Sequence, residues 1–229
     1  MATTADDIIN RVREILNDPS GIRWPDADLY RWMGDAQRDI SLLKPDATAT
    51  TSVLTTVAGT RQTIPTNGSR LLRVIRNMSA ASGGTGGKSI RPVSRELLDA
   101  QQPDWHDPTV AGDAAHAAVI KNYFYDEDEP LAFYVYPGAT GTTSYLEITY
   151  SKIADDPSSG SDALIVSDIF RNAVADYVVF KAYQSETEIE VSQQKATQFY
   201  NMFLTSVTGK SQIDQVTTPN LRRGPGSNG

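Results

Sequence analysis

The stretch DADLYRWMGDAQRDISLLKPDATATTSVLTT (26–56) contains the change of period on which the fold depends. Up to Leu43 its apolar residues recur at helical spacing, and Pro45 ends this pattern because proline does not continue a helix. From Ala49 the period changes to two, which is typical of a strand. The stretch therefore predicts a helix from about residue 25 that leads directly into a β region.

A shorter helix is expected before this stretch. Thr4 can cap it, and Asp7 stands three residues later in the capping-box position. The segment DPSG (18–21) ends it. One apolar stripe runs along the helix and comprises Ile8, Ile9, Val12, Ile15 and Leu16.

The β region continues for about a hundred residues. A short helix capped by Ser94 interrupts it at 94–99, and the stretch 103–116 is predicted to be surface loop. The candidate strands share β-branched and aromatic residues and cover 50–56, 61–64, 70–78, 88–93, 117–125, 131–137 and 144–152.

Two more helices follow, the first capped by Ser167 and the second ending at Gly209. Each of the four long helices has an apolar stripe too narrow to be buried alone, so the two pairs are expected to close into one bundle. The predicted fold class is α+β, a helical bundle with an inserted antiparallel β-rich domain and an extended C-terminal tail. The predicted domains are 1–48 and 154–208 for the bundle, 49–153 for the insertion, and 209–229 for the arm.

Composition narrows the possible functions. The net charge is −7, whereas proteins that hold nucleic acid by its phosphates usually present a basic face. The chain has no cysteine and two histidines, which excludes disulfides and thiolate metal sites. No apolar run is long enough to span a membrane. We expect no cofactor, no metal and no catalytic residues.

The run GGTGGKS (83–89) is similar to the end of a phosphate-binding loop. The first glycine of that pattern falls on Ser82, and Pro92 argues against a helix that starts at Lys88. We interpret the run as a Gly/Ser connection between strands, and nucleotide binding through Lys88 is the alternative hypothesis.

Three other local patterns have simple structural interpretations. The run Asp126–Glu129 is predicted to be a solvated turn, because it lacks the ligand spacing of a calcium loop. His106 is expected to form hydrogen bonds locally, and Trp105 to pack its loop onto the sheet. A tyrosine-rich set is predicted to be core or subunit interface rather than a stacking platform: Tyr123, Phe124, Tyr125, Phe133, Tyr134, Tyr136, Tyr145 and Tyr150.

The last 21 residues, from Gly209, contain four glycines and two prolines, with three basic side chains against one acidic side chain. Such a segment cannot build a core of its own. It is either a disordered terminus or an arm that a partner holds in place.

Several separated stretches together resemble one protein family. They are RWPDADLYRW (23–32) running on through GDAQRDISLLKPDA, RLLRVIRNM (70–78), IRPVSRELLDAQQPDW (90–105), YFYDEDEPLAFYVYP (123–137) and IFRNAVADYVVFKAYQSETE (169–188). In this order they are similar to the head-to-tail adaptor, or connector, proteins of tailed bacteriophages, particularly short-tailed ones.

The resemblance implies a non-enzymatic virion protein of the neck or tail, made in the host cytoplasm. About twelve copies would form a ring beneath the portal protein, dock the tail tube or nozzle protein, and surround double-stranded DNA without binding it specifically. It also implies that the C-terminal segment reaches the portal. We expect the portal-binding arm to use Ile213, Val216, Leu221, Arg222 and Arg223.

Two hypotheses from other classes remain open. A carbohydrate-binding or glycan-cleaving tail component would use the tyrosine-rich sheet, and specific glycan binding by the isolated protein would identify it. A nucleotide-binding packaging factor would need ATP binding that depends on Lys88.

Overall fold

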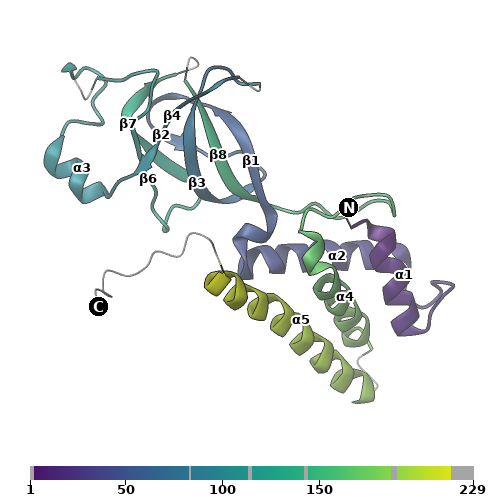
Figure 1. Cartoon of the computed structure of the whole chain (residues 1–229). Helices are drawn as coiled ribbons and strands as arrows, with labels where there is room; N and C mark the ends of the chain where they lie inside the picture. Colours follow the sequence, from purple (N-terminus) through teal and green to yellow (C-terminus); the bar gives the residue numbers. More distant parts are fainter. Residues whose placement is uncertain (1–2, 83, 113–114, 142–143, 187–189, 218–229) are drawn as a thin grey trace, which may run out of the picture. The chain divides into compact units, whose positions relative to one another are not determined.

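A computed structural model describes residues 3–82, 84–112, 115–141, 144–186 and 190–217. Within this part of the chain it contains five α-helices and eight strands, with helices at both ends, which confirms the α+β fold class (Figure 1). The residues form two compact units. A helical unit contains residues up to Ala47 and from Ala154 onward, and a β unit contains Thr48–Ile153.

Helix α1 (Ala5–Leu16) begins at the predicted capping box. The Thr4 backbone N–H donates to Asp7 Oδ2 at 2.9 Å, and the Asp7 N–H donates to Thr4 Oγ1 at 3.4 Å. These two bonds satisfy donors that the first helical turn leaves unpaired. Asn17 ends the helix in the left-handed region, at φ 53°.

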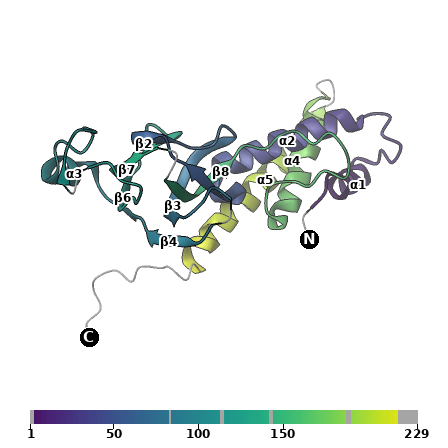
Figure 2. The ribbon, with the colours of Figure 1, turned by 90° about the horizontal axis from the view of Figure 1, so that it is seen from above.

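Helices α2 (Asp26–Leu43), α4 (Arg171–Gln184) and α5 (Glu190–Thr217) complete the helical unit. Helix α4 is the central one, since α1, α2 and α5 all pack against it, and Figure 2 shows α2, α4 and α5 running side by side. One apolar core joins all four helices, so the predicted bundle is confirmed. Its fully buried side chains include Ile8, Val12, Leu29, Met33, Ile40, Phe170, Val174, Val178, Phe203 and Val207.

Two predicted helix boundaries are wrong. Ser167 precedes a short 3-10 turn (Asp168–Phe170) and makes no capping hydrogen bond with its side chain, so α4 begins only at Arg171. Helix α5 does not end at Gly209 but continues to Thr217. A single glycine inside a helix costs about 1 kcal/mol, which neighbouring turns can offset.

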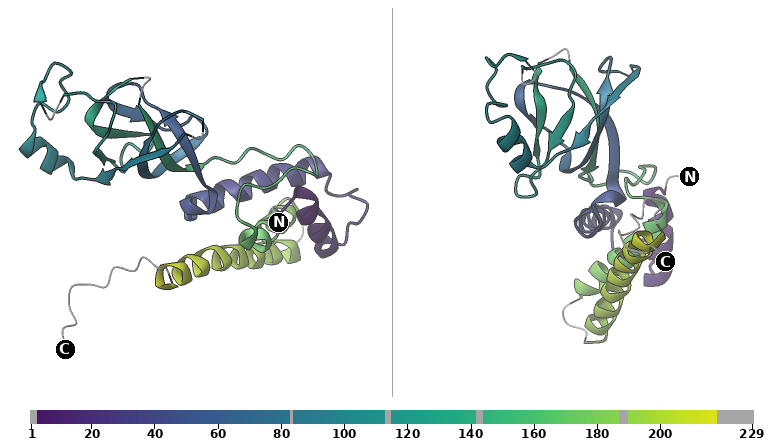
Figure 3. Two further views of the ribbon diagram at one scale, coloured as in Figure 1. Left: turned by 45° about the horizontal axis from the view of Figure 1, so that its top comes forward. Right: turned by 60° about the vertical axis from the view of Figure 1, so that its left-hand side comes forward.

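The β unit contains two four-stranded sheets. The first has the order β1 (Ala49–Thr55), β8 (Tyr145–Lys152), β3 (Gly68–Met78) and β4 (Gly86–Ser89). The second has the order β2 (Ala58–Thr63), β7 (Ala132–Thr140), β6 (Asn122–Phe124) and β5 (Arg91–Pro92). Figure 3 shows the two sheets facing each other.

The sequence predicted a purely antiparallel insertion. This prediction is wrong for one pair of strands, because β5 and β6 pair in parallel. Helix α3 (Arg95–Gln101) and a long loop connect these two strands, and a parallel pair requires such a crossover. All other neighbouring strands are antiparallel. Between the sheets lies a core that includes Leu71, Val74, Ile120, Phe133, Val135, Leu146, Ile148 and Tyr150.

Strand β3 has three evenly spaced irregularities in its pairing with β8. Its register against β8 shifts between Gly68 and Arg70, between Leu71 and Arg73, and between Val74 and Arg76. Each three-residue step on β3 therefore matches a two-residue step on β8, from Ser151 through Thr149 to Glu147. The arginines of RLLRVIR thus share the outer face, while Leu71 and Val74 are buried on the inner face.

Helix α3 and the loop after it cover the outer side of the second sheet. The Ser94 hydroxyl accepts a hydrogen bond from the Leu97 N–H, as predicted for the cap. Leu98 and Trp105 are buried with Tyr136, and Trp105 is only 1% exposed, which confirms its role as the anchor of the loop. None of the helices in the described residues is long and apolar enough to cross a membrane.

Candidate functional site

The residues predicted for the portal-binding arm fall into two groups. Ile213 and Val216 belong to α5, because this helix continues to Thr217. Leu221, Arg222 and Arg223 lie outside the described residues. The first nine residues of the predicted extended arm, from Gly209 to Thr217, are therefore helical.

The base of this arm is firmly packed against α4. The Phe203 ring is fully buried and lies 5.0 Å from the Tyr177 ring in an edge-to-face contact. One turn earlier, Phe199 stacks on Tyr183 at 6.0 Å. Burial raises the pKa of the Tyr177 hydroxyl, which therefore stays neutral at every pH of interest. Val207 is also fully buried. The packed segment thus reaches within two residues of Gly209.

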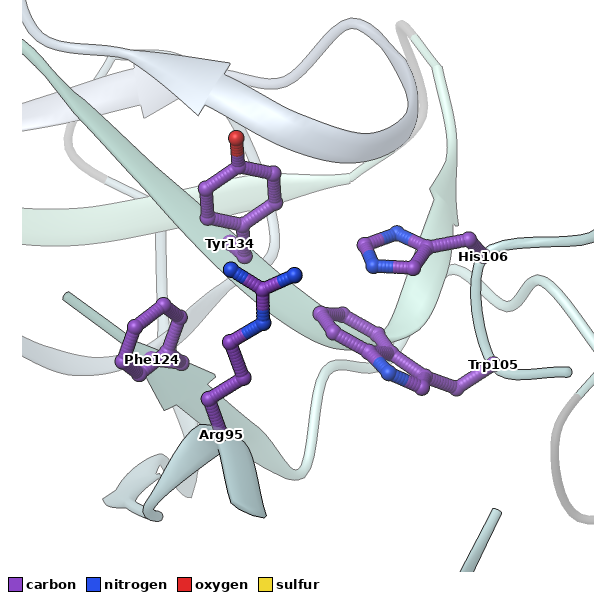
Figure 4. Close-up of a pocket in the computed structure, with 5 residues that line it drawn as sticks. All are labelled: Arg95, Trp105, His106, Phe124 and Tyr134. Carbon is purple, nitrogen blue, oxygen red and sulfur yellow. The ribbon is translucent and has the colours of Figure 1, made fainter. Parts of the chain in front are cut away.

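A small aromatic pocket lies on the β unit, between the second sheet and the segment of α3 (Figure 4). Phe124 and Tyr134 face each other across β6 and β7 with ring centres 6.1 Å apart. Trp105 meets the Tyr134 ring edge-to-face at 6.3 Å. Figure 4 shows the Arg95 guanidinium among these three rings.

Hydrogen bonds hold the pocket walls in place. The Trp105 indole N–H donates to Asp99 Oδ1 at 2.9 Å, and this bond lowers the pKa of the Asp99 carboxyl. His106 Nδ1 is 2.7 Å from the Thr60 hydroxyl. Thr60 lies in β2, far along the chain, so the expected local partner of His106 is wrong. Burial lowers the pKa of His106, with Asp99 opposing the shift, and the ring is therefore neutral near pH 7.

The pocket has a volume of about 110 Å³, below the ~300 Å³ at which ligand sites usually begin. Its rings also pack on one another; the rings of Trp105 and His106, for example, are 3.7 Å apart. Phe133, Tyr136 and Tyr150 of the tyrosine-rich set are buried. These contacts favour the packing interpretation of that set over a sugar- or base-stacking platform.

The run GGTGGKS is not a loop throughout, because Gly86–Ser89 forms strand β4 and pairs with β3. Lys88 therefore lies on a strand, and the next residues form strand β5 instead of a helix. A phosphate-binding loop requires a helix N-terminus at that point, so the geometry for nucleotide binding is missing here. Lys88 instead lines a groove of about 430 Å³ with Ser89, Arg91, Ile120, Lys121 and Asn122.

The acidic run Asp126–Glu129 forms the turn between β6 and β7, as predicted. Among the described residues, no group of three or more acidic or histidine side chains is arranged to hold a metal ion. The sequence drew attention to this acidic turn and to Lys88 as two separate features. It did not predict that Arg91 and Lys121 share a groove with Lys88, because residues 88, 91 and 121 form no sequence motif.

The sequence model of the family described as SU10 adaptor protein matches residues 3–223. This range includes all four helices of the bundle, both sheets and α5 to its end. A search of the curated proteins finds no match.

Proposed function

The chain belongs to the SU10 adaptor protein family, which makes it a structural head-to-tail adaptor of a bacteriophage, and we propose how it works. About twelve copies form a ring beneath the portal, and this ring extends the DNA channel and offers a platform to the tail tube or nozzle. The protein would then belong to the virion neck. The family match over nearly the whole chain is the observation that carries this proposal.

The C-terminal arm is proposed to dock the ring onto the portal. Helix α5 has 28 residues and is therefore about 42 Å long. Its middle is fixed to α4 through Phe203, so the residues beyond Val207 extend from a rigid base. In this proposal Ile213 and Val216 supply apolar contact from the helix, and Leu221, Arg222 and Arg223 follow it.

The charge of the chain suits a channel that DNA passes without specific binding. The helical unit contains 12 basic and 18 acidic residues, so most of the net charge of −7 belongs to it. Carboxylates repel phosphates, and a wall with excess carboxylates lets DNA slide. Tight binding would instead need a continuous basic face.

The test is to mix purified protein with purified portal rings and to image the products by electron microscopy. Full-length chain is compared with truncations ending at Thr217 and at Thr208. We expect the full chain to form a second ring on the portal. The truncation that ends at Thr217 should dock more weakly, and the truncation that ends at Thr208 should not dock. Absence of an added ring with folded full-length protein and intact portals would contradict the adaptor ring.

A paired substitution separates the arm from general charge effects. Arg222→Glu with Arg223→Glu should weaken docking and leave the thermal melt unchanged. The control is Arg31→Glu, which reverses the charge of an arginine on α2 whose side chain is 65% exposed. If the control and the arm variant dock equally well, the assignment of the arm is wrong.

A further inference from the structure

The groove beside Lys88 is cationic. Lys88, Arg91 and Lys121 line it together with Ser89, Ile120 and Asn122, and the lining contains no carboxylate. All three cations are exposed. Among the described residues neither Lys88 nor Arg91 forms an ion pair. We call this set the cationic groove, and it stands out on a chain of net charge −7.

The cationic groove is lined by residues from an edge strand of each sheet. Strand β4 ends the first sheet and β5 ends the second, and only Ile90 separates them in sequence. A single lysine on an edge strand serves to prevent unwanted pairing. Here two further cations, from β5 and from the residue before β6, line the same groove. This convergence exceeds what protection of an edge requires.

The backbone beneath these cations is held from several sides. The Asn77 amide donates to Lys88 O at 2.9 Å and to Ile120 O at 2.8 Å. The Arg91 N–H donates to Lys121 O at 3.2 Å. A surface fixed in this way loses little conformational entropy when it binds a partner.

The same unit carries a fixed acidic tip. In the turn Asp126–Glu129, Asp126 Oδ1 accepts a hydrogen bond from the Asp128 N–H at 3.0 Å. Glu129 forms an ion pair with Arg61 and accepts a hydrogen bond from the Tyr134 hydroxyl at 3.2 Å. The first bond closes the turn internally, and the contacts of Glu129 tie it to β2 and β7, while Glu127 and Asp128 are exposed. We call these two residues the acidic tip.

We propose that the cationic groove of one copy receives the acidic tip of a second copy. Groove and tip lie at opposite ends of β6, whose three residues alone span about 10 Å, so the tip is directed away from its own groove. Two different patches that meet between identical subunits make a head-to-tail contact, which closes into a ring when the rotation allows it. The proposal rests on the proposed function, since it names the contact between ring subunits.

Charge complementarity favours a second copy over nucleic acid as the occupant. The chain itself supplies a rigid anionic partner at the same concentration as the groove. A nucleic acid would also have to approach a chain of net charge −7. Binding of nucleic acid to the cationic groove is the competing outcome of the test.

The main experiment reverses charges on each side of the contact. Variant one is Lys88→Glu with Arg91→Glu, variant two is Glu127→Lys with Asp128→Lys, and variant three combines all four. Assembly is followed by sedimentation velocity of the free protein and by ring formation on portals. We expect variants one and two each to assemble only at a protein concentration at least about tenfold higher than wild type requires. Variant three should assemble at nearly the wild-type concentration, because its reversed charges again attract. The control, Arg70→Glu with Arg73→Glu, changes two arginines elsewhere on the β unit and should assemble normally.

Because the chain has no cysteine, a disulfide can report the contact directly. A chain carrying both Lys88→Cys and Asp128→Cys should form covalent ladders of several copies under mild oxidation. A chain carrying Arg70→Cys and Asp128→Cys should not, because a disulfide requires Cα atoms within about 7 Å.

The outcomes distinguish this inference from the proposed function. Rings that form on portals equally well with all folded variants would overturn the inference and leave the adaptor ring intact. Assembly that follows the charge pattern in free protein, without docking to portals, would support the inference and contradict the proposed function. Loss of oligonucleotide binding in variant one, with unchanged assembly, would make the groove a nucleic-acid site and overturn the inference. Wild-type protein that stays monomeric both alone and with portals would overturn both.

Discussion

The side chain of Asn77 and the backbone of Ile120 form a reciprocal pair of hydrogen bonds. Asn77 Oδ1 accepts from the Ile120 N–H at 2.8 Å, and Asn77 Nδ2 donates to the Ile120 carbonyl at 2.8 Å. Both residues are buried, and Ile120 directly precedes Lys121 of the cationic groove. The Asn77 side chain on β3 thus bonds both backbone groups of Ile120, as the backbone of a paired strand would. These bonds connect the first sheet to the segment that leads into β6 of the second sheet.

Asn77→Ala should lower the free energy of unfolding by about 3 kcal/mol, because it leaves a buried N–H and a buried C=O of Ile120 without partners. Urea unfolding of the full chain measures the effect. Asn122→Ala is the matched control: its amide makes a single bond of 3.5 Å at the surface, and the expected change is within about 0.5 kcal/mol. Equal midpoints for the two variants would show that the Asn77 pair contributes little.

Thr4→Ala should destabilise the helical unit by about 1 kcal/mol, because it removes the hydroxyl that accepts from the Asp7 N–H and donates to Asp7 Oδ2. Thr4→Ser keeps the hydroxyl and should retain most of the stability. Thermal melts of the two variants make the comparison. Identical melting temperatures would contradict a role for the hydroxyl.

Phe203→Ala should cost about 3–5 kcal/mol, because it empties a fully buried site between α5 and α4. Hydrogen exchange should then rise along α5 before it rises in α1. Met202→Ala provides the control on the same helix, since the Met202 side chain is half exposed and the expected loss is small. Unchanged exchange in α5 would mean that other contacts hold the base of the arm.

The Asp162 carboxylate should make the stability of the fold sensitive to acid. Ser158 and Ser159 donate hydrogen bonds to its carboxylate from both N–H and hydroxyl groups, which lowers the pKa of Asp162 to about 2. The unfolded pKa is about 3.9. A lowered folded pKa stabilises the fold above pH ~4, and this stabilisation is lost as the pH falls towards about 2.

The turn that Asp162 organises also accepts hydrogen bonds from the first turn of α1, through the carbonyls of Gly160 and Asp162. Asp162→Asn should therefore be less stable than wild type at pH 6 and should lose less stability between pH 4 and pH 2. Urea midpoints measured across that range test this. Parallel pH profiles for the two proteins would exclude the carboxylate as the cause.

Much of the fold could be predicted because the relevant interactions are local. The capping box of α1 needs only Thr4 and Asp7, and the end of α2 at Leu43 follows from Pro45. The β region could be placed between the helices because β-branched and aromatic residues, separated by turn residues, mark strands within short stretches of sequence. Trp105 was recognised as an anchor because a large apolar ring in a polar loop seeks a surface to pack on.

The wrong predictions concern segments whose structure depends on distant partners. Gly209 is a typical helix end, yet α5 passes through it after packing on α4 as far as Val207. The composition of GGKS (86–89) indicated a loop, but Asn77 and the backbone of β3 provide hydrogen-bond partners that hold it as a strand. Neither partner can be inferred from the local sequence.

The sequence by itself determined the helical and alternating periods, the caps, the charge and the family resemblance, because each depends on residues close in the chain or on composition. Only the tertiary structure decided where the charged side chains of the β unit gather. The arginines of RLLRVIR share a face because three register shifts against β8 convert a three-residue repeat into a two-residue one. Lys88, Arg91 and Lys121 share a groove because β5 pairs with β6 across a long crossover. Strand register and crossover pairing arise from hydrogen bonds between segments far apart in sequence, and no local pattern records them.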